Sequence, residues 1–244
     1  SEKPSVATVS AAGVITGKAP GTTNVVAKLG KLVSVSASVQ VEGEMGTWKK
    51  SGGKWWFQLD DGSYPYSQWA QIDGDWYHFD HSGYMQTGWL KLGKSWYYLK
   101  SSGPMAEGWQ KVGGAWYYLN PGSGAMATGW KQVGGTWYYL KGSGAMATGW
   151  QKVGGSWYYL KGSGAMAVGW QKIGGTWYYL KDSGAMATGW RQIDGHWYFL
   201  SGSGAMAKNK WVGDYYVTGS GAMATNTWIG KYHVNAAGKW DQTR

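Results

Sequence analysis

The chain has 244 residues, no cysteine and a formal net charge of +10, and its 42 Gly, 20 Trp and 18 Tyr far exceed ordinary usage. This composition leaves little material for a helical or α/β core, and the lack of cysteine excludes disulfide scaffolds, thiolate nucleophiles and cysteine-based zinc sites. The basic charge favours a polyanionic partner. No apolar run approaches the ~18 residues of a spanning helix, so we expect no membrane insertion. Because the chain opens at Ser1 without a signal peptide, we expect it to be a piece of a longer protein.

The first segment, residues 1–44, contains no aromatic ring, whereas every ring of the chain lies after Gly46. Residues 6–10, 21–27 and 32–41 alternate apolar and small polar residues between Gly/Pro turns, which predicts strands. Residues 5–17 and 20–27 resemble the second half of a bacterial Ig-like domain of group 2. The resemblance implies that this segment is the remnant of a spacer domain.

A repeat begins at Trp48 and is counted on the first Trp of each unit. The period is 20 or 21 residues and shortens to 17 at the end. Each of the first eight units has a second Trp seven positions after the first, so these pairs account for sixteen of the 20 tryptophans. Repetition of this kind is typical of a solenoid or array.

Each unit predicts a β-hairpin. In the unit from Trp130, Gly134 and Gly135 separate two β-rich runs and predict a two-residue turn. Alternation then places Trp130, Gln132, Trp137 and Tyr139 on one face, and Lys131, Val133, Thr136, Tyr138 and Leu140 on the other. A lone hairpin is marginal in water, so we expect the units to stack. A repeated screw operation would bring Tyr158 of the next hairpin toward Trp130 and Trp137.

Three rings around a small volume suit a quaternary ammonium ion, which donates no hydrogen bond and is cheap to desolvate. Each ring contributes about 0.5 to 2 kcal/mol, so one cage should bind with a Kd of about 1 mM. Useful affinity would then come from several cages on one polymer. The alternative is that the tryptophans fill a core. Against it, Trp is a costly filler, and Val133, Leu140 and Met146 already offer core residues.

The pattern Gly-Trp, variable residues, Trp-Tyr-Tyr-Leu and Gly-Ala-Met-Ala-Thr-Gly-Trp resembles the choline-binding repeat of streptococcal, including pneumococcal, surface proteins over residues 45–244. The resemblance implies an all-β fold, a left-handed β-solenoid of stacked hairpins. It also implies a non-catalytic, extracellular module on the bacterial cell wall surface that binds phosphocholine of teichoic and lipoteichoic acids. Related repeats in glucosyltransferases and toxins make glucan or glycan binding the alternative.

The family's cage combines the two Trp of one repeat with the first Tyr of the next, in agreement with the hairpin register. For Met146 and its equivalents a packing role is favoured, and lining of a cage wall is the alternative. The predicted choline cages are Trp48, Trp55 and Tyr77; Trp69, Trp76 and Tyr97; Trp89, Trp96 and Tyr117; Trp109, Trp116 and Tyr138; Trp130, Trp137 and Tyr158; Trp150, Trp157 and Tyr178; Trp170, Trp177 and Tyr198; and Trp190, Trp197 and Tyr215.

The last units differ, which divides the repeats into residues 45–207 and an atypical end, residues 208–244. Asp214 and Lys231 align with the second Trp, so a cage on Trp211 would offer only Trp211 and Tyr232, and one on Trp228 has no following Tyr. Too little cation–π energy would remain, and we expect residues 208–244 to form a non-binding cap.

Catalytic signals are absent from the sequence. No Gly-x-Ser-x-Gly elbow, phosphate loop or paired carboxylate occurs, and strand alternation separates His78 from His81, so neither an enzyme nor a metal site is predicted here, although a parent protein can carry a separate catalytic domain. No cofactor is predicted beyond the ligand choline. Because the basic residues are dispersed and the rings caged, nucleic acid is not an expected partner.

Overall fold

The computed structural model describes residues 1–4, 6–10, 12–17, 21–26, 28–29, 32–33, 36–41 and 46–244. These residues form strands and turns and contain no helix, which confirms the all-β prediction. The described residues therefore include no helix that is long and apolar enough to cross a lipid bilayer. By its contacts the chain divides into two compact units, Ser1–Ala127 and Thr128–Arg244.

The aromatic-free segment forms short antiparallel pairs. Its strands are β1 (Ala7–Val9), β2 (Ile15–Gly17), β3 (Gly21–Val25), β4 (Lys28–Leu29), β5 (Leu32–Val33) and β6 (Ala37–Val41). β1 pairs with β2, β3 with β6, and β4 with β5. The strands expected at residues 6–10 and 21–27 correspond to β1 and β3, except that residue 27 lies outside the described residues. The single strand expected at residues 32–41 is instead two strands with different partners.

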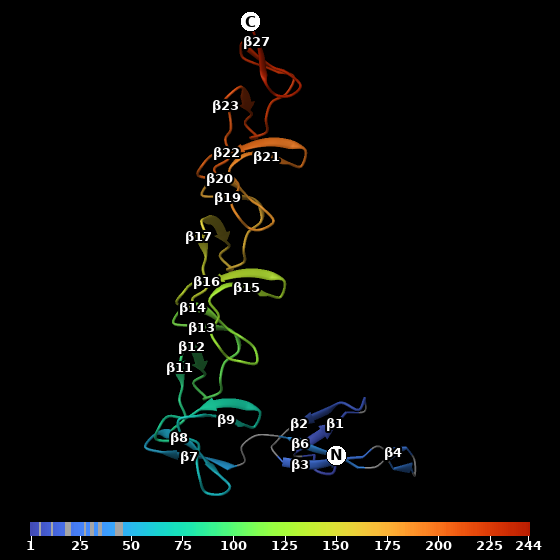
Figure 1. The fold of residues 1–244 in the computed structure, drawn as a ribbon, viewed down its shortest axis with the longest axis vertical. Coiled ribbons are helices and arrows are strands. Elements are labelled where there is room, and N and C mark those ends of the chain that lie inside the picture. Colours follow the sequence, from blue (N-terminus) through green and yellow to red (C-terminus); the bar gives the residue numbers. More distant parts are fainter. Residues whose placement is uncertain are drawn as a thin grey trace. The chain divides into compact units, whose positions relative to one another are not determined.

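The repeats form a series of two-stranded hairpins, drawn in Figure 1 as paired arrows. In the first unit they are β7 (Gly46–Ser51) and β8 (Lys54–Leu59), β9 (Trp69–Ile72) and β10 (Asp75–His78), β11 (Gly88–Leu92) and β12 (Ser95–Leu99), and β13 (Gly108–Val112) and β14 (Ala115–Leu119). In the second unit they are β15 (Gly129–Val133) and β16 (Thr136–Leu140), β17 (Gly149–Val153) and β18 (Ser156–Leu160), β19 (Gly169–Ile173) and β20 (Thr176–Leu180), β21 (Gly189–Ile193) and β22 (His196–Leu200), and β23 (Lys210–Val212) and β24 (Tyr215–Val217). The last sheet has three strands, β25 (Thr227–Ile229), β26 (Tyr232–Val234) and β27 (Trp240–Thr243).

The hairpin register is the one predicted from the two-residue turn. Trp130 pairs with Tyr139, and Gln132 pairs with Trp137. Gly134 and Gly135 have φ angles of +55° and +78°, the left-handed conformation that such a turn needs and that glycine adopts without strain. The register puts both tryptophans of the repeat on the same face of the hairpin.

The linkers between hairpins are structural elements as well as connections. After β18, the Lys161 N–H donates to the Ala165 carbonyl, and Met166 forms a bridge with Leu160. The Met166 N–H then donates to the carbonyl of Trp137, in the preceding hairpin, over 2.8 Å. This linker therefore joins its own hairpin to the one before it.

In most hairpins the fully buried large side chain is a leucine and not the second Trp. The last residue of the second strand is fully buried in successive hairpins, at Leu99, Leu119, Leu140, Leu160, Leu180 and Leu200. By contrast, the second Trp of each pair remains exposed, with Trp157 at 41%. Because aliphatic side chains supply the core, the Trp pairs are available for another role.

Candidate functional site

The aromatic cage is clearest at Trp150, on β17. Its ring lies 6.4 Å from that of Trp157 on β18, at an interplanar angle of 90°, and 4.9 Å from that of Tyr178 on the next hairpin. Tyr159, directly across the hairpin, packs against Trp150 at 5.2 Å and holds it in place. The two indole rings thus stand at right angles, and Tyr178 is inclined to Trp150 by 66°, so the three rings form walls of one space.

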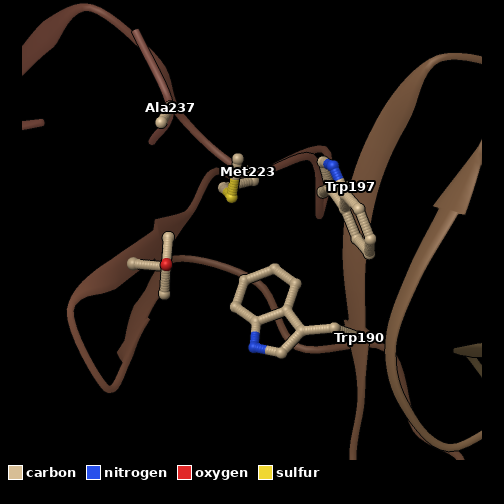
Figure 2. Close-up of a pocket in the computed structure, with 5 residues that line it drawn as sticks. Trp190, Trp197, Met223 and Ala237 are labelled. Carbon is tan, nitrogen blue, oxygen red and sulfur yellow. The ribbon is translucent and has the colours of Figure 1, made fainter. Parts of the chain in front are cut away.

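That space is a cavity of about 310 Å³, lined by Trp150, Trp157, Tyr178 and Met186 together with Gly202 and Ser203. A matching cavity of about 280 Å³ lies two repeats further on, lined by Trp190, Trp197, Tyr215, Met223 and Ala237. Figure 2 shows its two indole rings and the Met223 sulfur around the same space. Flat aromatic faces around a small opening bind an organic cation through the ring quadrupoles.

In the other predicted triads whose members lie in one unit, the first Trp lies about equally close to the Tyr of the next hairpin. The distances between the first Trp and the Tyr of the next hairpin are 4.9 Å for Trp48 and Tyr77, 5.2 Å for Trp69 and Tyr97, 4.7 Å for Trp89 and Tyr117, 4.8 Å for Trp130 and Tyr158, 4.9 Å for Trp170 and Tyr198, and 5.5 Å for Trp190 and Tyr215. Trp109 lies 6.4 Å from Trp116, while Tyr138 belongs to the other unit. That these triads bind choline stays a prediction.

Methionine is the cage residue that sequence reasoning undervalued. A packing role was favoured for the linker Met over lining the cage wall, yet Met186 and Met223 each line a cavity. The Met186 N–H donates to the Trp157 carbonyl over 2.7 Å, which fixes the Met beside the cage. It also packs on Gly204, where an added Cβ would overlap the Met186 sulfur. The available signal was a Met nine or ten residues after the second Trp in seven of the eight repeats.

Lysine lies directly across the hairpin from the second Trp in five of the eight cages. These pairs are Lys50 and Trp55, Lys91 and Trp96, Lys111 and Trp116, Lys152 and Trp157, and Lys172 and Trp177. The Lys91 ammonium lies 5.7 Å from the centre of the Trp96 ring, and that of Lys50 lies 5.3 Å from Trp55. A cation in such a cage therefore has a positive side chain close by.

Two groups on β10 have shifted pKa values, Tyr77 of the first cage and its neighbour His78. Burial, and then the charges of Asp75 and Asp73, raise the pKa of Tyr77, so this cage phenol stays neutral at physiological pH. Burial lowers the pKa of His78, partly offset by its 2.6 Å hydrogen bond to Gln86. Asp80 accepts hydrogen bonds from the Ser82 and Tyr84 N–H groups and so shapes a turn.

At the end of the chain, the expected ring count is wrong. Asp214 does occupy the second-Trp position, because its carbonyl accepts a hydrogen bond in the same way as that of Trp197. The donor, however, is the N–H of Trp240, whose indole lies 6.2 Å from Tyr232. Trp211, Tyr232 and Trp240 therefore surround one cavity, so three rings are present instead of two.

The final Trp has a different neighbour. Lys231 also occupies a second-Trp position, and its carbonyl accepts from the Arg244 N–H over 3.0 Å. The Arg244 guanidinium lies 4.5 Å from the centre of the Trp228 ring. The chain itself thus places a cation on Trp228, in keeping with the expectation that Trp228 forms no ligand cage.

A sequence profile of the choline-binding repeat matches residues 67–106, 87–128, 127–168 and 167–211, and a second profile of the repeat matches residues 205–240. No curated protein sequence matches the chain.

Solved structures from Streptococcus pneumoniae are similar to the chain. CbpJ shares 30% identity over 91% of this chain and all of CbpJ, with a TM-score of 0.63. Choline binding protein F, solved with a peptidoglycan analogue, shares 32% over 85% of this chain and 96% of its own, with a TM-score of 0.62. The autolysin LytC shares 33% over 81% of this chain but only 47% of its own, with a TM-score of 0.63. Stacked hairpins, interhairpin aromatic clusters and the matched repeats together show that the chain belongs to the family of choline-binding repeat proteins.

Proposed function

We propose that this chain is a non-catalytic module that attaches a protein to the outside of the bacterial cell wall by binding phosphocholine groups of teichoic and lipoteichoic acids. The observation that carries the proposal is the cavity between consecutive hairpins, lined by two Trp, one Tyr and one Met. A trimethylammonium group cannot donate a hydrogen bond, so a cage of ring faces without hydrogen-bonding demands matches it.

Each cage takes one choline. Three rings at about 0.5 to 2 kcal/mol each correspond to a Kd of about 1 mM for a single cage. A polymer that carries many phosphocholines engages several cages at once, and the effective concentration then raises avidity far above that of one cage. The number of repeats is thus the source of tight attachment.

The phosphate of the ligand accounts for the lysines opposite the second Trp. A lysine such as Lys152 beside Trp157 would repel a bare cation but attract the phosphate joined to choline. With a net charge of +10, the whole chain favours a polyanionic teichoic acid. Nucleic acid, in contrast, would need the rings on an open surface for base stacking.

The aromatic-free segment, residues 1–44, is proposed to be part of an Ig-like spacer, residues 45–207 the binding repeats, and residues 208–244 the end that closes them. Two antiparallel strand pairs of the segment, β1 with β2 and β3 with β6, suit such a spacer.

The experiment is retention on diethylaminoethyl cellulose, followed by elution with millimolar choline. Elution by choline but not by glucose or dextran supports the cages as choline sites. Elution by glucan alone would contradict the proposal and establish the glycan-binding alternative. Titration calorimetry on the same protein then counts the sites.

A further inference from the structure

The cavity at the end of the chain repeats the backbone plan of a cage with different side chains. In the preceding cage, the Met223 N–H donates to the Trp197 carbonyl and Met223 bridges Val217. One hairpin later, the Trp240 N–H donates to the Asp214 carbonyl over 2.7 Å, and Trp240 is paired with Val234. Asp214 therefore replaces the second Trp, and Trp240 replaces the Met.

These replacements keep three aromatic walls and add a carboxylate. The cavity measures about 340 Å³ and is lined by Trp211, Gly213, Asp214, Tyr232 and Trp240. The Tyr232 ring lies 5.7 Å from Trp211 and 6.2 Å from Trp240, at interplanar angles of 83° and 86°. The indole N–H of Trp240 donates to the Gln242 carbonyl over 3.0 Å, which orients the new wall. The cage is thus rebuilt by a strand outside the repeat period.

The carboxylate changes which cation the cavity suits. A quaternary ammonium can use the rings and the charge of Asp214, but it has no N–H to donate. An ammonium with at least one hydrogen can also donate a charge-assisted hydrogen bond to the carboxylate, which replaces part of its lost hydration. In the cavities at Trp150 and Trp190, no carboxylate lines the space, and a strongly hydrated primary ammonium gains nothing equivalent there.

We propose that this terminal cavity is a ninth ligand site that binds an organic ammonium carrying N–H, such as a primary amino alcohol, in preference to the quaternary ion suited to the other cages. The proposal rests on the proposed function and adds a second kind of ligand to it. It replaces the expectation that residues 208–244 form a non-binding cap. The Lys239 ammonium, 3.6 Å from the Asp214 carboxylate, is the intramolecular competitor of the ligand, and both side chains are about half exposed. Lys231, 5.3 Å from the Tyr232 ring, adds a further positive charge.

The test uses nuclear magnetic resonance of the full chain, with ethanolamine and choline as probes. The indole N–H signals of Trp211, Trp240 and Trp157 are assigned with Trp→Phe variants. Ethanolamine should move the signals of Trp211 and Trp240 at concentrations that leave Trp157 unmoved, while choline should move Trp157. Ethanolamine shifts of equal size and midpoint at every cage, or none at Trp211 and Trp240, would overturn the proposal.

Variants then locate the source of the preference. Asp214→Asn should weaken ethanolamine binding at this cavity about five- to tenfold, the usual loss for a half-exposed charge-assisted hydrogen bond, and weaken choline less. Lys239→Gln should tighten ethanolamine binding, because it removes the competitor. Asp182→Asn, a matched change at an exposed linker turn, should alter neither. Unchanged ethanolamine affinity in Asp214→Asn would contradict the role of the carboxylate.

The two proposals fail separately. If choline moves no indole signal and elutes no protein, the proposed choline function fails, whatever ethanolamine does. If choline binds the cages but ethanolamine leaves Trp211 and Trp240 unmoved, only the terminal site fails. Trp240→Met restores the residue type of the other repeats and should abolish the ethanolamine shift at Trp211, while Trp157 still responds to choline.

Discussion

Replacing Trp157 by Ala should separate ligand binding from folding. The Trp157 side chain is 41% exposed, and its ring contacts Trp150 across the cage. Its hydrogen bond from Met186 uses the main-chain carbonyl, so the substitution leaves it in place. Loss of one exposed aromatic wall should cost the cage about 1 kcal/mol of cation–π energy, or about a fivefold loss of choline affinity.

The matched control is Leu160→Ala, three residues away on the same strand. Leu160 is fully buried, so its truncation should lower the free energy of unfolding by roughly 2 to 4 kcal/mol through cavity formation. Trp157→Ala should lower stability much less. We expect Leu160→Ala to unfold at a lower temperature and to keep its choline stoichiometry. Trp157→Ala should keep its stability, while the choline affinity of one site becomes too weak to detect at millimolar choline.

Calorimetric choline titration and thermal unfolding of both variants provide the measurement. If Trp157→Ala loses as much stability as Leu160→Ala and keeps every choline site, the tryptophans are core residues and the cage interpretation is refuted. Trp150→Ala is a less clean test, because Trp150 is half-buried against Tyr159 and its removal would also disturb the hairpin.

Three further outcomes are expected. Gly184→Ala should destabilise the second unit, because Gly184 has a φ of +79° and a Cβ there would overlap the Met166 sulfur; thermal unfolding measures this, and Gly162→Ala, with open space, is the control. Burial lowers the pKa of His78, so the stability it contributes is complete above its unfolded pKa of about 6.5 and is lost as pH falls toward its folded value. The variant His78→Tyr carries the residue found at this position in other hairpins, and its free energy of unfolding should fall less between pH 7 and 5 than that of the original chain. An equal fall in both proteins would contradict the role of His78 in this pH dependence. Moderate salt should weaken binding to teichoic acid more than binding to free choline, because only the polymer's phosphates use the net charge; equal salt dependence in two titrations would refute the electrostatic contribution.

The regular part of the site could be predicted from the sequence because the same two-residue turn recurs in each hairpin and determines the register. A two-residue turn fixes which residues face each other, so the pairing of Trp130 with Tyr139 followed directly from counting. The approach of Tyr158 to Trp130 followed from stacking identical hairpins. Periodicity supplied both steps without any knowledge of side-chain packing.

The irregular end could not be predicted in this way. Trp240 and Arg244 lie beyond the last repeat, where no counting rule places them next to Asp214 and Lys231. Strand β27 brings them there, after a register shift between His233 and Val234 in its partner β26. The aromatic-free segment was harder for a related reason, since alternation alone did not reveal that residues 32–41 contain two strands with different partners.

Hairpin β17–β18 contributes to two cages, with Trp150 and Trp157 in one and Tyr158 in the preceding one. A choline seated between Trp150 and Tyr178 therefore touches two hairpins and acts as a removable crosslink. At ten times its Kd, each bound ligand adds about 1.4 kcal/mol to the stability of the folded state. Attachment and stiffness thus rise together: the hairpins are most firmly joined while they hold the wall polymer, and they loosen when it leaves.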